Sequence, residues 1–233
     1  MKDYWFDGSP VLTHYHNAFS ILFPAWEEVF ANVAEHRKKD ISDPELLVRM
    51  DKFIAQELAH GKAHGKHNAR YGLSDSANDQ MKLAQVALRR PQAKAWLAAM
   101  VSIEHIAACL SRDFLKTHGH KRESGFTLFR WHSVEELEHK SLALDVWNHL
   151  GYDTVTLHTV ARSNFVYVWK FILGYTLDNL RKEKQLWRVR TIFDGTKLFG
   201  ALVFRVWVPY LRIFRQGFHP NAIDDSKFIS RAV

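Results

Sequence analysis

Two short segments carry residues whose types and spacing could bind metal ions. Residues 131–139 contain His132, Glu136 and His139. At about 100° per residue, these three side chains fall on one face of a helix. An earlier segment repeats the Glu-x-x-His spacing with Glu57 and His60. A single pair of this kind is common on solvated helix faces, so the repetition is what indicates a metal site.

Two further segments add glutamates to this pattern. Glu104 lies in the middle of an apolar helical stretch, and Glu27 and Glu28 flank another; periodicity does not choose between the latter two. A bundle with one Glu from each of two helices and Glu-x-x-His from each of two others is the di-iron or di-manganese carboxylate arrangement. Four carboxylates offset the charge of two divalent ions, and each ion gains an imidazole. The sequence therefore predicts a site for two metal ions.

The hydrophobic pattern predicts an all-α protein, since no strand pattern of any length is found. Residues 1–16 are expected to form an irregular arm, followed by a first helix from about residue 17 with Pro24 early in it. Asp43-Pro44-Glu45 combines an N-cap acid with a first-turn proline and predicts a second helix that ends near residue 68. Residues 71–79 are expected to form a loop.

The rest of the chain completes a ferritin-like four-helix bundle with a crossover connection. A short crossover helix is expected over 80–90, a third core helix from Pro91 to about residue 116, and a fourth over 126–150. Two more helices are expected over 154–217, before an irregular tail. Residues 1–153 would form the bundle with its arm, and residues 154–233 would pack on it, as part of the same domain or as an appendage.

Composition narrows the class of protein. In 233 residues, 47% hydrophobic and 24% charged side chains are typical of a folded globular chain. The single cysteine, Cys109, has apolar neighbours, which predicts a packed thiol and favours a reducing, cytoplasmic compartment. Neither a signal peptide nor a transmembrane helix is expected. Much of the net charge of +7 follows residue 160 without a nucleic-acid motif, so no nucleic-acid partner is expected.

Two aromatic and basic segments near the C-terminus leave three interpretations open. Residues 163–180 are nearly continuous apolar, and residues 198–214 combine aromatic side chains with arginines. This pair of helices could cover the four-helix core, form a homodimer interface, or lie on an anionic membrane surface as a peripheral contact.

Four motifs resemble one known family: Phe23-Pro24-Ala25-Trp26-Glu27, Glu57-Leu58-Ala59-His60, Ile103-Glu104-His105 and the segment from Trp131 to Lys140. The family is that of the predicted metal-dependent hydrolases, which belongs with the ferritin-like di-metal proteins. The resemblance covers most of the chain, including Phe218-His219-Pro220. It implies Glu27 and not Glu28 as the first-helix ligand, although Trp26 stands where the family pattern has glycine.

A more distant resemblance concerns the ligand helices alone. His132, Glu136 and His139 are similar to the fourth-helix motif of the di-iron arylamine N-oxygenases, which implies that His132 is an additional ligand. The predicted metal ligands are thus Glu27, Glu57, His60, Glu104, His132, Glu136 and His139. His64 could bind metal or support a ligand, and we favour support. Glu135 is expected to orient His132 or His139 through an N–H bond.

Three hypotheses for function follow, in order of preference. The first is a di-iron oxidase or oxygenase that uses O₂ on a small organic substrate, which the abundant aromatic residues suggest is lipophilic. Iron is the expected metal, and manganese or zinc would also fit the ligands. The second is a hydrolase with a dinuclear metal site, as the family description says. The third is a bundle without enzymatic activity, for iron storage or structure.

Overall fold

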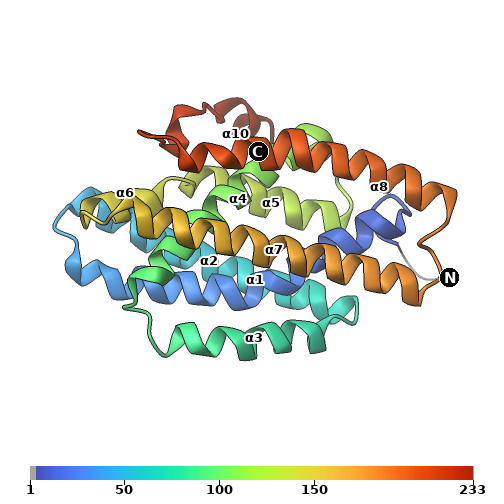
Figure 1. Cartoon of the computed structure of the whole chain (residues 1–233), viewed down its shortest axis with the longest axis horizontal. Coiled ribbons are helices and arrows are strands. Elements are labelled where there is room, and N and C mark those ends of the chain that lie inside the picture. The colour runs from blue at the N-terminus through green and yellow to red at the C-terminus, as the bar shows by residue number, and fades with distance from the viewer. Residues whose placement is uncertain (1–3, 233) are drawn as a thin grey trace.

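The computed structural model describes residues 4–232, and within this range the chain is all-α with no strand, as predicted. The long helices run side by side along the longest axis of the molecule (Figure 1). Four of them face the predicted metal site: α1 (Pro10–Arg37), α2 (Pro44–Arg70), α4 (Lys94–His118) and α5 (Ser124–His139). Helix α3 (Ser74–Leu88) connects α2 to α4 and packs against α1.

Helix α2 begins where its start signal predicts. The Asp43 side chain accepts hydrogen bonds from the backbone N–H groups of Glu45 and Leu46, at 2.9 and 3.2 Å. These bonds satisfy two of the free donors of the first turn. The buried face of the helix then leads from Leu46 through Phe53 to Glu57. A local signal thus sets the register that turns Glu57 toward the interior.

Helix α1 begins at Pro10, not near residue 17. Most residues from 10 to 22 are buried, so no one-sided apolar stripe marks the start of the helix. Pro24 consequently lies in the middle of α1. The sequence had suggested a position near the first turn, and this prediction was wrong. Because proline has no N–H group, the carbonyl of Ser20 lacks its usual helical donor. Asn68 on α2 supplies one instead, through its Nδ2 at 2.7 Å.

The fourth core helix is broken, which contradicts the single helix predicted over 126–150. Helix α5 ends at His139, and α6 (Leu142–His149) follows after two residues. At the break, the buried Lys140 donates to the Asp225 carboxylate at 2.5 Å and to the Ile223 carbonyl at 2.6 Å. Arg112 on α4 donates to both oxygens of the same carboxylate. The chain turns where the side chain of Lys140 reaches the C-terminal tail.

The C-terminal third also departs from the prediction. Helix α7 (Thr154–Lys182) is followed by α8 (Val189–Ala201), which continues as a π-helical segment, Leu202–Trp207. The shorter elements are η1 (Lys38–Asp40), α9 (Val208–Tyr210), η3 (Leu211–Phe214), η4 (Pro220–Ala222) and α10 (Ser226–Ala232). The tail is therefore not irregular, and the loop predicted over 71–79 is helical from Ser74.

Two apolar clusters form the core, and each combines residues from 1–153 with residues from 154–233. One contains Phe53 and Tyr210, and the other contains Phe19 and Trp169. The hydroxyl of Tyr210 lies 2.9 Å from both the Ser102 hydroxyl and the Ala161 carbonyl. On α1 and α4, the predicted ligands Glu27 and Glu104 directly follow Trp26 and Ile103, which pack against both clusters. Among the described helices, none is long and apolar enough to cross a membrane.

Candidate metal centre

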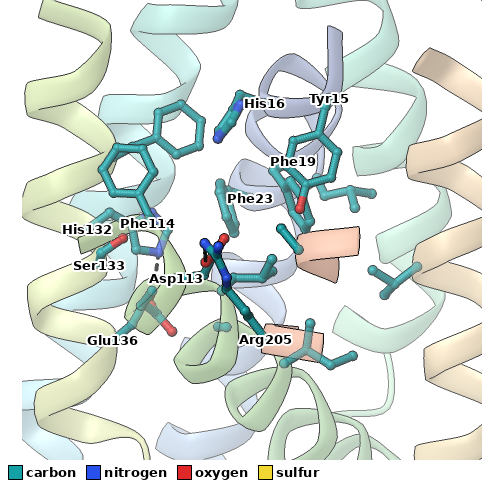
Figure 2. Close-up of a pocket in the computed structure, with 18 of the residues that line it drawn as sticks. Tyr15, His16, Phe19, Phe23, Asp113, Phe114, His132, Ser133, Glu136 and Arg205 are labelled. Atoms are coloured by element: carbon teal, nitrogen blue, oxygen red, sulfur yellow. Dashed lines mark hydrogen bonds and ion pairs between the residues drawn. The ribbon is translucent and has the colours of Figure 1, made fainter. Parts of the chain in front are cut away.

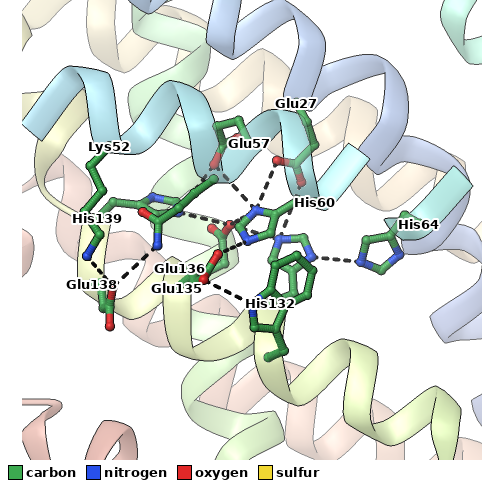
Figure 3. Close-up of polar contacts among 12 residues, drawn as sticks. Glu27, Lys52, Glu57, His60, His64, His132, Glu135, Glu136, Glu138 and His139 are labelled. Atoms are coloured by element: carbon green, nitrogen blue, oxygen red, sulfur yellow. Dashed lines mark hydrogen bonds and ion pairs between the residues drawn. The ribbon is translucent and has the colours of Figure 1, made fainter. Parts of the chain in front are cut away.

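The seven predicted ligands are all buried and come from α1, α2, α4 and α5; Figure 3 labels all of them except Glu104. Six of them form two overlapping groups, in each of which one ligand atom per residue lies within 4.8 Å of the others. The groups are Glu27, His60, His132 and Glu136, and Glu57, His60, Glu136 and His139. Because the groups share His60 and Glu136, the arrangement suits two adjacent metal ions. Glu28 belongs to neither group among the described residues, which favours Glu27.

His60 lies at the middle of the cluster. Its Nδ1 is 3.4 Å from an oxygen of Glu27, and 3.7 Å from an oxygen of Glu57 and from one of Glu136. Its ring stacks on that of His132, with centroids 4.1 Å apart. A single nitrogen therefore faces three carboxylates that come from three different helices.

Glu135 determines which nitrogen of His60 faces the cluster. A Glu135 oxygen lies 2.9 Å from His60 Nε2, and the other accepts a hydrogen bond from Trp131 Nε1 at 3.0 Å. Since a carboxylate only accepts, Nε2 carries a proton, and Nδ1 is the nitrogen that a metal ion could bind in place of a second proton. The sequence predicted His132 or His139 as the partner of Glu135, but the structure shows His60.

A line of hydrogen bonds ends at His132. The Ser20 hydroxyl donates to Asn68 Oδ1 at 2.8 Å, so it accepts from His64 Nδ1, which lies 2.9 Å away. His64 Nε2 is then unprotonated and accepts from His132 Nδ1 at 2.8 Å. His64 therefore supports His132, which is the interpretation favoured from the sequence.

Because Nδ1 of His132 carries the proton, its Nε2 has a lone pair, and this lone pair faces the carboxylates of Glu136 and Glu27. Its Nε2 lies 2.9 Å from a Glu136 oxygen and 3.4 Å from a Glu27 oxygen. With its proton on Nδ1, this nitrogen has none to donate, so a cation or a shared proton must separate it from the two carboxylates. A divalent metal ion would satisfy all three groups.

His139 contacts three of the glutamates. Its Nε2 lies 3.3 Å from a Glu57 oxygen and 3.6 Å from a Glu136 oxygen, while Nδ1 is 3.0 Å from Glu104 Oε2. Phe53 packs edge-on against its ring at 4.9 Å. Glu104, also a predicted ligand, contacts the outer nitrogen of His139 through Oε2 and lies outside both groups, so its role as a ligand stays a prediction.

Burial and mutual repulsion set the electrostatics of the centre. Burial, together with the charges of neighbouring carboxylates, raises the pKa values of Glu27, Glu57 and Glu104 well above their usual range. Burial lowers the pKa of His132 well below its usual value. For His60 the effect of burial is outweighed by contact with Glu57 and by the nearby carboxylate charges, which raise the pKa to about 9. The centre thus favours added positive charge.

Four inward-facing atoms provide a direct test of whether the residues fit metal. They are buried and have no hydrogen-bond partner within the described part of the chain: Glu27 Oε2, Glu57 Oε1, His60 Nδ1 and His139 Nε2. Leaving such groups unsatisfied is costly. Each belongs to a predicted ligand, and a mixed set of imidazole and carboxylate donors suits iron, manganese or zinc. The residues therefore fit a pair of divalent metal ions.

A cavity of about 550 Å³ adjoins the centre (Figure 2). It reaches His132 and Glu136 at one side, and most of its lining is apolar, including Phe19, Phe23 and Phe114. Polar side chains also line it: Asp113, Asp194, Lys197 and Arg205, with Arg205 donating to Asp113 at 3.0 Å. The cavity was not predicted from the sequence, because apolar residues that line a cavity have the same helical pattern as residues of the core.

The only cysteine lies away from the metal ligands and belongs to the apolar core. Cys109 is 1% exposed, and burial raises the pKa of its thiol to about 11. This confirms the packed thiol that its neighbours predicted.

An all-α bundle with two overlapping buried groups of histidine and glutamate defines a metal-binding protein of the helix-bundle class. Residues 1–224 match the model of a family described as predicted metal-dependent hydrolase, so the chain belongs to that family. No curated protein and no solved structure shows significant similarity to it. The family resemblance seen in the sequence is confirmed. The ferritin-like relationship and the likeness to N-oxygenases stay predictions.

Proposed function

We propose that the protein is a hydrolase that uses two metal ions to cleave an ester of a lipophilic compound. The observation that carries the proposal is the position of His132 and Glu136, which belong to the metal centre and also line the apolar cavity. A substrate held by the apolar lining would place a polar bond beside these two residues. The family description supports hydrolysis over the oxygen chemistry that the sequence analysis preferred.

In this proposal Glu27 and His132 would hold one ion and Glu57 and His139 the other, while the Glu136 carboxylate could serve both ions and His60 Nδ1 one of them. Two bound ions would polarise the ester carbonyl and lower the pKa of a water molecule.

Three outer residues contact the outer nitrogen of each ligand histidine and so direct the other nitrogen toward the centre. Glu135 takes the N–H of His60, His64 takes that of His132, and Glu104 takes that of His139. Such outer contacts typically change metal affinity or activity by about 10- to 100-fold when they are removed. The chain therefore prepares the centre before metal arrives.

The cavity lining supports the substrate class. Phe19, Phe114 and their neighbours would bury an acyl or alkyl chain, while Lys197 and Arg205 supply positive charge for a polar end. Phe23 packs at 4.4 Å from the ring of His132 and keeps that side of the centre apolar. This arrangement suits a molecule with one long apolar part and one polar part.

A second candidate is oxidation of the same kind of compound with iron and O₂. The observation that favours it is the third histidine, His132, whose Nε2 faces the cluster beside Glu27 and Glu136. A centre rich in imidazole and carboxylate donors, next to a mostly apolar cavity, would suit that chemistry as well.

The test starts from protein stripped of metal and reloaded separately with zinc, manganese or ferrous iron. Under hydrolysis, the zinc or manganese form cleaves p-nitrophenyl esters of long acyl chains faster than short ones and consumes no O₂. Under the second candidate, only the iron form consumes O₂, and no form cleaves esters.

A pair of variants tests the site itself. Glu136→Gln should lose metal and activity. Glu138→Gln changes an exposed neighbour that pairs with Lys52 and should keep both. Metal content unchanged in Glu136→Gln would refute the site.

A further inference from the structure

The face of α8 and its π-helical continuation exposes an unusual amount of apolar surface. Of the sixteen large apolar side chains that are exposed in the described chain, eight lie between residues 187 and 211. Trp187 is 83% exposed and Phe204 is 75% exposed. We call the strip formed by Trp187, Val189, Phe193, Phe204, Val208 and Leu211 the α8 ridge. Exposed apolar side chains gathered in one place mark an interaction surface.

The ridge is one face of an amphipathic element. The opposite face is buried through Thr191, Leu202, Val206 and Tyr210, which follow one another at helical spacing. Leu202 and Val206 belong to the core cluster that contains Trp169. The element is thus anchored to the protein on one side and presents aromatic and aliphatic side chains outward on the other.

Positive charge flanks the ridge. Between residues 187 and 215 the sequence contains one acid, Asp194, and six basic residues, all of them exposed: Arg188, Arg190, Lys197, Arg205, Arg212 and Arg215. Asp194 already accepts a hydrogen bond from Ser9 at 2.6 Å. Arg188, Lys197, Arg212 and Arg215 form no ion pair with a carboxylate of the described residues. Much of the positive charge of the chain is therefore available to an anionic partner.

We propose that the α8 ridge docks on the surface of an anionic lipid bilayer. Helices that lie in the bilayer interface combine Trp, Phe and Leu on one face with Lys and Arg at its border, which is the composition found here. A protein–protein interface is also enriched in aromatic residues and arginine, so what favours the bilayer is the number of cations without a carboxylate partner. Unpaired cations beside a strip of aromatic side chains match anionic headgroups above acyl chains.

The cavity gives this surface a structural context. Lys197, Leu198, Ala201 and Arg205 line the cavity, and they belong to the same stretch of chain as the ridge; Figure 2 labels Arg205 among the lining residues. A bilayer on the ridge would lie against the element that closes the cavity. Docking itself needs neither metal nor catalysis, so it stands apart from the proposed hydrolysis.

The experiment measures sedimentation of the full chain with lipid vesicles, with and without bound metal. Vesicles of phosphatidylcholine are compared with vesicles that also contain phosphatidylglycerol, at low and at high salt. Wild-type protein should bind the anionic vesicles, bind the neutral ones much less, and be released by salt because exposed charges are screened. Metal-free protein should bind equally well. Protein that stays in the supernatant with anionic vesicles at low salt overturns the proposal.

Matched variants locate the surface. Replacing Phe193 and Phe204 by Ser should weaken binding by about tenfold or more, since two exposed aromatic anchors are lost. The control replaces Val48 and Val86, which are similarly exposed elsewhere, by Ser and should bind as wild type. Equal loss of binding in both double variants would contradict the bilayer proposal. The proposal is also wrong if the wild-type protein sediments as a dimer and the Phe193/Phe204 variant sediments as a monomer. Circular dichroism confirms that each variant is folded.

Discussion

Pro24 affects His132, although the two residues lie on different helices. Its missing N–H leaves the Ser20 carbonyl to Asn68, and this bond orients the Asn68 amide so that its oxygen accepts from the Ser20 hydroxyl. The hydroxyl must then accept from His64, whose other nitrogen accepts from His132. A helix defect in α1 therefore selects the tautomer of a metal ligand.

The variant Pro24→Ala should separate stability from metal binding. It restores the N–H that competes with Asn68 for the Ser20 carbonyl, so the free energy of unfolding of the metal-free protein should rise. Metal affinity should fall by about 10-fold or more, because the orientation of His132 is no longer fixed. Urea denaturation and a metal titration measure the two quantities.

Two further variants serve as controls for Pro24→Ala. Asn68→Ala breaks the same line without restoring a helical bond, so it should lower affinity without raising stability. Pro91→Ala, in the connection before α4, should leave metal affinity unchanged. Equal affinity in wild type and Pro24→Ala would show that the line does not control His132.

The raised pKa values of Glu27, Glu57 and Glu104 predict how stability depends on pH. A carboxyl whose folded-state pKa is raised stabilises the fold fully below its unfolded value of about 4.3, and this contribution is lost as pH rises through the folded-state pKa. Metal ions replace the protons and remove this loss. The increase in Tm on adding metal should therefore grow from about pH 5 to about pH 8. A constant increase would contradict the raised pKa values.

At the level of single residues, the sequence predicted much of the metal centre. Helical spacing alone places Glu136 and His139 on one face, and the repeated pair on α2 supplies Glu57 and His60. The line behind His132 was missed, although Ser20 stands four residues before Pro24, where a proline leaves a carbonyl free. The partner of Glu135 could not be predicted, because it depends on how α5 faces α2.

Among the helices, the break between α5 and α6 depends on one buried carboxylate. Asp225, in the C-terminal tail, binds Arg112 of α4 and Lys140 at the break. All three side chains are buried or nearly so. Removing the acid would leave two positive charges without a partner, and such a loss costs about 3–5 kcal/mol.

Asp225→Ala should therefore lower the free energy of unfolding by about 3–5 kcal/mol in urea denaturation. Asp79→Ala removes an exposed carboxylate that pairs with Lys82 and should change it by less than about 1 kcal/mol. A similar small change in both variants would mean that the tail does not hold the break.

The elements that were predicted correctly are those with local signals. The second helix was found because Asp43 and Pro44 mark its start regardless of the rest of the fold. The break at Lys140 was missed because its cause, Asp225, lies 85 residues further along the chain. The π-helical segment after Ala201 likewise has no signal in a sequence that reads as one continuous apolar helix.

For the whole molecule, the cavity predicts substrate selection by length. Ala107 lines it from α4, and a larger side chain there would fill part of the volume. Ala107→Phe should lower kcat/KM for long-chain p-nitrophenyl esters by about 10-fold or more while short-chain esters and metal content change little. Ala95→Phe, exposed on the same helix, is the control. Equal loss for short and long chains would argue against binding in this cavity.

The relation between Phe53 and His132 makes the two metal positions unequal. Phe53 precedes Glu57 by four residues, as His132 precedes Glu136, so the corresponding position of the two Glu-x-x-His motifs is a phenylalanine in one helix and a histidine in the other. His132 opens on the cavity, whereas Phe53 covers His139. A chelator should consequently remove the metal in two phases, a fast one from the position beside the cavity and a slow one from the position behind Phe53. Phe53→Ala should bring the two rates together.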